Sequence, residues 1–554
     1  MRNAMKRTIL AAGAALCVVL PAQSMADGMR LAPQLPDESC LVPAADSPAP
    51  EEAAPPPVLM EGLGFAGIEA DSASDRARAW FAQGVRLIWA FDEAEAIRAF
   101  QQAQAADPDC ALCHFGEAWA RGPTINLQPR TDELAAARAA ARRAQALSGA
   151  LSARDKILIE GMAIRTGDGA AFANTAYADF MEAAAERMPE DDVIAVMAAD
   201  ARMVESENMR PGSLSQRLLE RVLARNPNHS GAIHFYIHLT DWTDEQRLAE
   251  RYAERLGEIA PAASHLVHMP SHTFYGIGRY RDAAAVNVAA IAADRDYLSR
   301  VRPPRSDYRY YLNRHNMQFA INSALARGDG ATALAVSGQY RGEYLAGQVD
   351  PASRLLGSAT YYSAGLHSPV ADVLALAEPS HALDKAMRHY ARGEALARAG
   401  DAAAVRAEAR AIEALREGTL APALGRGGGA LAEIFQRVLE GRAAMLAGKF
   451  RSAERAYRRG MERQLAAGFG FDPPLFWYSI RRSLAAAQIA RGESRGAREQ
   501  LRASLRRWPN DPLALYALSL AERRLGDAAA ADASLRQARE IWAGDVGEVP
   551  LSRI

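Results

Sequence analysis

A recurring 34-residue spacing is the feature of this sequence that most constrains its fold. Equivalent residues stand 34 apart in two distant stretches of the chain: Pro227 and Pro261, Ala249 and Ala283, Gly492 and Gly526, and Ala497 and Ala531. A fixed period of a few tens of residues is typical of repeat proteins, in which each unit packs mainly on its neighbours. The spacing therefore favours a stack of similar units over a single globular core.

The clearest unit begins at residue 77 and carries a known pattern of residue types. Its positions 4, 8, 20, 24, 27 and 32 are Trp80, Gly84, Ala96, Phe100, Ala103 and Pro108. This is the tetratricopeptide signature, in which the first four pack two helices together and the proline ends the second helix. Weaker units begin near 111, 158, 192, 314, 386 and 434, and no alternating strand pattern occurs. We predict an all-α, right-handed α-solenoid of about ten tetratricopeptide-like helix pairs with a concave groove.

The amino-terminal segment predicts export. Basic residues precede an apolar run from Ile9 to Leu20, and Ser24-Met25-Ala26 offers small residues before a cleavage point. This pattern predicts a signal peptide over residues 1–26. The apolar run is too short to span a bilayer, and no longer one follows, so we expect a periplasmic or secreted protein without a transmembrane segment.

The remaining chain divides by composition. Residues 27–74 are rich in Pro, Ala, Ser and acidic residues, which predicts a disordered linker. We place an N-terminal repeat array with a histidine-rich groove at residues 75–345 and a C-terminal array at residues 346–554. Lys and Arg number 65 against 66 Asp and Glu, a net charge of -1, so no overall field favours nucleic acid and we expect no nucleic-acid partner.

Histidines are concentrated in one short stretch of the chain. Residues 229–272 hold six of the eleven histidines. His234 and His238 form one i, i+4 pair and His268 and His272 form another, so each pair lies on one helix face. The pairs are 34 residues apart, and they therefore occupy equivalent places in two neighbouring repeats.

These histidines fall at positions that face the groove in tetratricopeptide repeats. Counted from repeat starts at 230, 264 and 314, positions 2, 5 and 9 hold His234, His238, His265, His268, His272, His315, Gln318 and Asn322. Imidazoles from adjacent helices can share one ion at about 2.0 to 2.1 Å, and Zn, Cu, Ni and Fe all accept such ligands. The alternative is a peptide or protein partner bound in the groove. Convergence of at least three ring nitrogens would favour the metal, which should then be released as the pH falls below about 6.

The cysteines offer a second candidate site. Cys40, Cys110 and Cys113 follow the predicted cleavage point, and Cys110-Ala-Leu-Cys113-His114 matches the c-type haem attachment pattern. His114, however, falls at position 4 of its repeat, where Trp80 is a core residue in the preceding unit. We therefore expect a Cys110–Cys113 disulfide, or a bridge from Cys40 to one of the two, in preference to haem.

The sequence as a whole also resembles a protein family. The segments that carry the resemblance are 81–84, 107–113, 122–126, 234–238, 265–272 and 315–316. They are similar to segments of large exported bacterial tetratricopeptide proteins of unassigned activity, which implies a helical-repeat fold and export. Members of that family often carry histidine where Phe65, Ala66 and Gln318 stand here, which implies an altered site in this chain.

Three functional hypotheses follow from these observations. The first is a scaffold that binds a peptide or protein, the second is a metal-binding protein or metal-dependent enzyme, and the third is a haem electron carrier. The sequence contains no Walker loop, HExxH or GxSxG motif, so no reaction is predicted.

Overall fold

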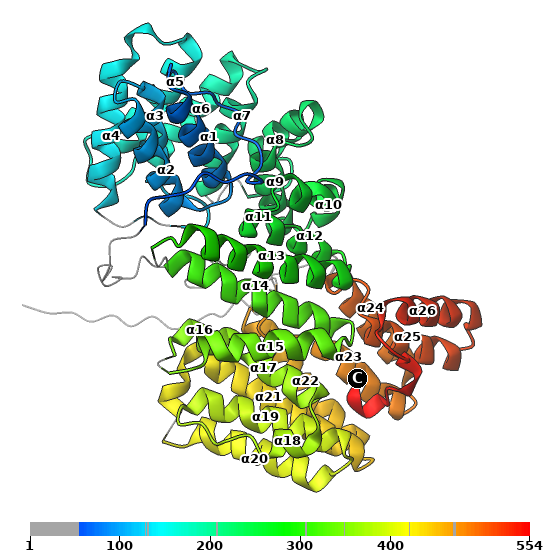
Figure 1. The fold of residues 1–554 in the computed structure, drawn as a ribbon. Coiled ribbons are helices and arrows are strands. Elements are labelled where there is room, and N and C mark those ends of the chain that lie inside the picture. The colour runs from blue at the N-terminus through cyan, green and yellow to red at the C-terminus, as the bar shows by residue number, and fades with distance from the viewer. Residues whose placement is uncertain are drawn as a thin grey trace, which may run out of the picture.

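The computed structural model describes residues 55–554 except for 128, 130, 131, 206–208, 305, 306, 348, 420 and 469–472. Within these ranges every regular element is a helix, and successive helices pair antiparallel and stack side by side (Figure 1). The chain is an all-α solenoid of tetratricopeptide-like helix pairs, which confirms the predicted fold class. None of its described helices is both long and apolar enough to cross a membrane.

The first five helix pairs run to residue 259. They are α1 (Asp75–Trp89) with α2 (Glu93–Ala106), α3 (Ala111–Ala120) with α4 (Glu133–Leu147), α5 (Ala153–Thr166) with α6 (Asn174–Arg187), α7 (Asp192–Val204) with α8 (Leu214–Arg225), and α9 (Ser230–Trp242) with α10 (Glu250–Ile259).

The rest of the array continues the same pattern with one irregular insertion. The further pairs are α11 (Ser264–His268) and α12 (Pro270–Gly276) with α13 (Tyr280–Val301), α14 (Asp307–Ala326) with α15 (Gly330–Tyr344), α19 (Ala382–Arg398) with α20 (Ala402–Glu417), α21 (Gly425–Leu446) with α22 (Phe450–Ala466), α23 (Ile480–Ala490) with α24 (Ser494–Arg507), and α25 (Pro512–Arg524) with α26 (Ala528–Ile541). Between α15 and α19 lie the short helices α16 (Pro351–Leu356), α17 (Ser358–His367) and α18 (Val370–Leu374).

The residues of the 34-residue period have physical roles in these pairs. Gly492 and Gly526 follow the first helix of their pairs with φ of 88° and 83°, a left-handed conformation that glycine adopts without strain. Ala283 on α13 is fully buried, as its place in the predicted repeat frame requires. A small residue there lets α13 pack closely on α11 and α12.

Two large clusters of buried hydrophobic residues meet at α13 and α14. A first core extends from Met60 to Ala326 and a second from Ile291 to Ala487, so α13 and α14 contribute to both. The two clusters therefore meet before residue 346, the array boundary expected from the sequence. The final helices turn back onto the middle of the chain, where the Tyr280 hydroxyl donates to the Pro509 carbonyl at 2.8 Å (Figure 1, red beside green).

The segment that precedes α1 packs against the first core. Met60, Leu63 and Ile68 are buried, and the Met60 amide donates to Gln83 Oε1 at 2.7 Å. The predicted disordered linker extended to residue 74, but the apolar side chains in its last part pack against the folded repeats. Residues 1–54, which include the predicted signal peptide and Cys40, lie outside the described residues.

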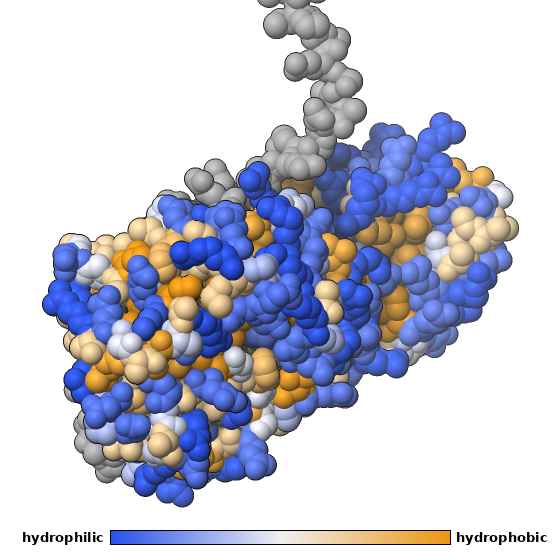
Figure 2. All heavy atoms as spheres, turned by 90° about the horizontal axis from the view of Figure 1, so that it is seen from above, coloured by the Kyte–Doolittle hydropathy of each residue, from blue (hydrophilic) through white to orange (hydrophobic). Residues whose placement is uncertain are grey.

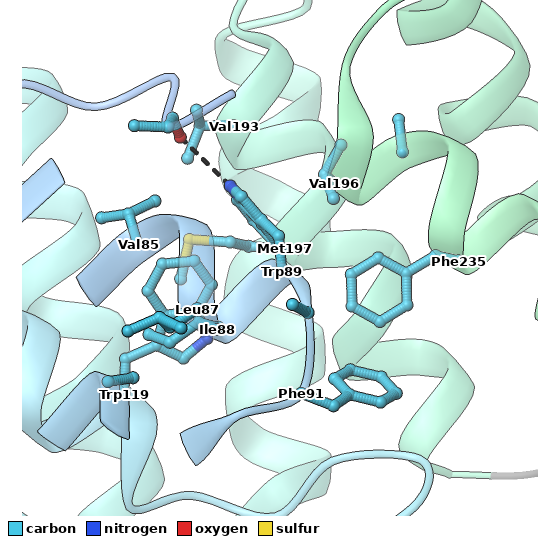
Figure 3. Packing of buried hydrophobic residues seen from close by; sticks show 14 of the residues in the cluster. Val85, Leu87, Ile88, Trp89, Phe91, Trp119, Val193, Val196, Met197 and Phe235 are labelled. Atoms are coloured by element: carbon cyan, nitrogen blue, oxygen red, sulfur yellow. Dashed lines mark hydrogen bonds between the residues drawn. The ribbon is translucent and has the colours of Figure 1, made fainter. Parts of the chain in front are cut away.

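The carboxyl end of α1 is fixed by a dense aromatic cluster. Trp89 packs edge-on against Trp119 and Phe235, and its indole Nε1 donates to the Ala66 carbonyl at 3.1 Å (Figure 3). Phe91 lies beside Phe235 in the same cluster. This packing holds the α1–α2 turn rigidly against α9, the helix that carries the first histidine pair.

Candidate metal centre

Six histidines from four helices converge in the interior of the middle repeats. His234 and His238 come from α9, His265 and His268 from α11, His272 from α12 and His315 from α14. They form two groups, which we name triad A (His234, His238 and His265) and triad B (His268, His272 and His315). Within each triad, one ring nitrogen per residue lies within 4.8 Å of those of the other two.

Triad A is organised around His234. Its Nδ1 lies 2.6 Å from the carbonyl oxygen of Trp89, the last residue of α1. A carbonyl can only accept, so Nδ1 carries the proton and the Nε2 lone pair of the neutral ring is free to bind. That Nε2 lies 3.0 Å from His265 Nε2 and 3.1 Å from His238 Nε2.

Triad B repeats this arrangement around His268. Its Nδ1 lies 2.7 Å from Asn287 Oδ1, and Asn287 Nδ2 donates to the Ala283 carbonyl, also at 2.7 Å. The second contact fixes the orientation of the amide, so His268 must donate through Nδ1 and presents a bare Nε2. That atom lies 3.0 Å from His272 Nε2.

These spacings resemble those of ligands around a single ion. Nitrogens at 2.0 to 2.1 Å from a tetrahedral metal stand about 3.3 Å apart, close to the 3.0 to 3.1 Å of three nitrogen pairs here, and the other pairs within each triad lie within 4.8 Å. The hydrogen bonds at Nδ1 also match the usual surroundings of metal-binding histidines, which donate their second nitrogen to a carbonyl or carboxylate. His272 Nδ1 faces a carboxylate, since it lies 3.5 Å from Asp241 Oδ2, a longer contact than the hydrogen bonds of His234 and His268.

A phenyl ring covers each triad. The Phe91 ring centroid lies 4.3 Å from that of His234, 5.8 Å from His238 and 5.6 Å from His265. Phe319 of α14 lies 5.2 to 5.6 Å from the three rings of triad B. Phe91 has a φ of 54° and follows the end of α1, where the Asp92 amide donates back to the Leu87 carbonyl at 2.9 Å. This left-handed helix end sets the position from which the Phe91 ring packs against triad A.

Burial favours the uncharged form of five of the six histidines. Burial lowers the pKa of His234 to about 3, and burial together with the neighbouring His272 and Arg314 lowers the pKa of His315 to about 3. The pKa values of His238, His265 and His268 also lie well below 6.5, first through burial and then through the adjacent imidazoles. Neutral imidazole is the form that binds metals, so these rings are ready to do so at neutral pH.

The arrangement differs from the predicted one in two respects. The sequence predicted one patch on an open groove, whereas four of the six side chains are 0 to 6 % exposed and form part of the packed interior. The six also divide into two sets, because His265 reaches back to the α9 pair while His315 joins the α11–α12 pair. His229, the remaining histidine of the enriched segment, instead accepts from the Ala232 amide at the start of α9.

Several residues that shape the triads carried no sequence signal. The Trp89 carbonyl belongs to the backbone, and Phe91 and Phe319 look like ordinary core residues. Asn287 lies in the alanine-rich helix α13, and its role becomes visible only in the structure, where its side chain is fully buried. Position in the repeat does not reveal such contacts, since they depend on how neighbouring helices pack.

The cysteine motif at residues 110–113 has a structural role. Cys110 and Cys113 are joined in a disulfide and both are fully buried at the start of α3. Asp71 accepts from the amides of Ala111 and Leu112 there, which stabilises the first turn of the helix. Haem attachment would require both thiols, so the disulfide argues against the haem hypothesis.

Two buried carboxylates have raised pKa values. Burial raises the pKa of Glu93, at the start of α2, to about 8, and that of Asp200 on α7 to about 7. Each has one carboxylate oxygen that is buried without a hydrogen-bond partner. Both groups therefore tend to hold a proton at neutral pH.

Comparison with known proteins adds little to this geometry. No protein-family model matches the chain, and the search of curated proteins finds no match. Among solved structures, a human IFIT1 dimer with m7Gppp-AAAA has a TM-score of 0.28 and 13 % identity over 85 % of this chain and 91 % of that one. Naa15/Naa10 bound to HypK-THB has a TM-score of 0.22 and 13 % identity over 86 % and 90 %. Scores this low support no inference about activity or partners.

Proposed function

We propose that this helical-repeat protein binds transition-metal ions at triads A and B. The observation that carries the proposal is the convergence of three imidazole nitrogens in each triad, with the proton of His234 and of His268 held on the opposite ring nitrogen. At 3.0 Å the Nε2 of His265 or His272 can donate a proton to the bare Nε2 that it faces, with both rings neutral, or both nitrogens can bind one ion. In triad A the single Nε2 lone pair of His234 faces two such neighbours, because His238 Nε2 also lies 3.1 Å away. A hydrogen bond to one neighbour leaves the other nitrogen unused, whereas a metal ion binds all three.

A metal fits the burial of the site better than a peptide does. A partner-binding groove needs accessible side chains, whereas four of the six histidines are at most 6 % exposed. Figure 2 shows polar and apolar side chains mixed over the face it presents, without a uniform apolar surface for a partner. Three protein ligands leave a fourth position for water or substrate, the usual state of a catalytic metal site. A metal-dependent enzyme in an exported scaffold is therefore the proposed class.

Zinc binding by the metal-free protein tests the proposal. After chelator treatment, Zn²⁺ is added in small excess, the protein is desalted, and bound zinc is measured by mass spectrometry. We expect two zinc ions per chain in the wild type, one in His238→Ala, one in His272→Ala and none in the double variant. Less than one retained ion in the wild type, or equal zinc in all variants, would overturn the proposal.

A matched control separates specific binding from loss of any imidazole. His229→Asn removes a fully buried histidine from the same segment but keeps a side-chain acceptor at the start of α9. It should retain two zinc ions. Thermal unfolding of each variant establishes that it is folded under the conditions of the measurement.

A further inference from the structure

The two triads are close enough to act as one centre. The His238 and His272 ring centroids are 6.1 Å apart, and those of His265 and His268 are 5.9 Å apart. Both distances are shorter than the 6.2 Å between His238 and His265 within triad A. At these two places the rings of the triads are in direct contact range, so ions held by the triads would be near neighbours.

A phenyl ring packs against each triad. Phe91 packs against all three rings of triad A, and Phe319 packs against all three rings of triad B. These phenyl rings close one side of each triad with apolar surface. On another side the triads face each other, where His238 lies beside His272 and His265 lies beside His268.

The charge of the site selects the metal. All six side chains of the two triads are imidazoles, which bind metals as neutral ligands, and the carboxylate of Asp241 contacts them at His272 Nδ1, which lies 3.5 Å from its Oδ2. Burying charge in an apolar interior is costly, so two monovalent ions are favoured over two divalent ions. Copper meets this requirement, because it is stable as Cu(I) and binds imidazole, and as Cu(II) it binds more tightly than the other first-row divalent ions.

We infer that triads A and B together hold a coupled pair of copper ions that binds dioxygen between them; this inference rests on the proposed metal binding. In the binding step each Cu(I) gives up one electron and the two electrons reduce one O₂ to peroxide. Peroxide then bridges two Cu(II) ions while its O–O bond stays intact. No proton or further reductant is required, and each copper keeps its three imidazole ligands.

Stoichiometric oxygenation of the copper-loaded protein tests the inference. The metal-free protein is loaded anaerobically with Cu(I), copper is counted, and dioxygen is added while oxygen uptake, near-ultraviolet absorption and electron paramagnetic resonance are recorded. We expect two copper ions and one O₂ consumed per chain, a new charge-transfer band, and no paramagnetic signal, because bridged Cu(II) ions couple their spins.

Single-triad variants provide the matched comparison. His238→Ala and His272→Ala each leave one complete triad, so each oxidised variant should hold one copper with the ordinary signal of isolated Cu(II). His229→Asn should behave as the wild type does. Two copper ions with two uncoupled spins per wild-type chain would overturn the coupled centre while leaving metal binding intact. Failure to retain copper at all would instead overturn the proposed function itself.

Discussion

Asn287→Leu offers a sharp test of how the structure prepares triad B. The fully buried amide fixes the His268 proton on Nδ1 through a 2.7 Å hydrogen bond and is itself held by the Ala283 carbonyl. Leucine has a similar volume but no acceptor, so His268 Nδ1 loses its hydrogen-bond partner. The proton of the neutral ring can then lie on either nitrogen, and Nε2 is no longer held ready to bind the metal. Loss of such an outer partner typically weakens metal binding 10- to 100-fold, or about 1.4 to 2.8 kcal/mol.

The metal-free protein should also be destabilised by this substitution. An orphaned buried donor costs about 1 to 3 kcal/mol. Ser271 Oγ, at 3.3 Å from the same nitrogen, can recover part of that loss. Asn287→Asp keeps an acceptor oxygen towards His268 but turns its second oxygen to the Ala283 carbonyl, so it should restore only part of the metal affinity that Asn287→Leu removes.

Zinc affinity is best measured by chelator competition in two backgrounds. In His238→Ala only triad B is complete, and Asn287→Leu should weaken binding there. In His272→Ala only triad A is complete, and the same substitution should leave affinity unchanged. Equal losses in both backgrounds would show a general packing defect, and no loss in the first would refute the role assigned to Asn287.

Three further predictions concern stability. Burial lowers the pKa of His234 and His315 to about 3, so below pH 6.5 the folded metal-free protein binds fewer protons than the unfolded chain. The free energy of unfolding should therefore fall as the pH drops towards 3, by roughly 2 kcal/mol for each histidine at pH 5. Denaturant titrations should show this loss, and bound zinc should persist well below pH 6; unchanged stability down to pH 4 would contradict it. Glu93, with its pKa raised to about 8, retains a proton that the unfolded chain releases, so stability should fall as the pH rises from about 4.5 to 8, and Glu93→Gln should add roughly 1 to 3 kcal/mol at pH 7. If Glu93→Gln destabilised the protein at pH 7 but not at pH 4, this prediction would be wrong. Ala283→Leu should overpack α13 and cost about 1 to 3 kcal/mol in thermal or denaturant unfolding, whereas a neutral effect would place this residue outside the close packing.

The sequence determined the helical repeat architecture, because the signals involved are local or periodic. The residue types of one unit recur in others, so the residues that pack one helix pair also pack the next. The fully buried Ala283 and the left-handed Gly492 and Gly526 occupy the places that the 34-residue period assigns to them. The same period places His234 and His268 on equivalent helix faces.

The tertiary structure decided which histidines meet and in what environment. His265 and His268 are three residues apart on one short helix, yet they join different triads, because one ring points to α9 and the other to α12 and α14. Burial by Phe91 and Phe319 lowers their proton affinity, and the Trp89 carbonyl and Asn287 select the binding nitrogen. These contacts join residues up to 145 positions apart, and a spacing rule within one repeat contains no information about them.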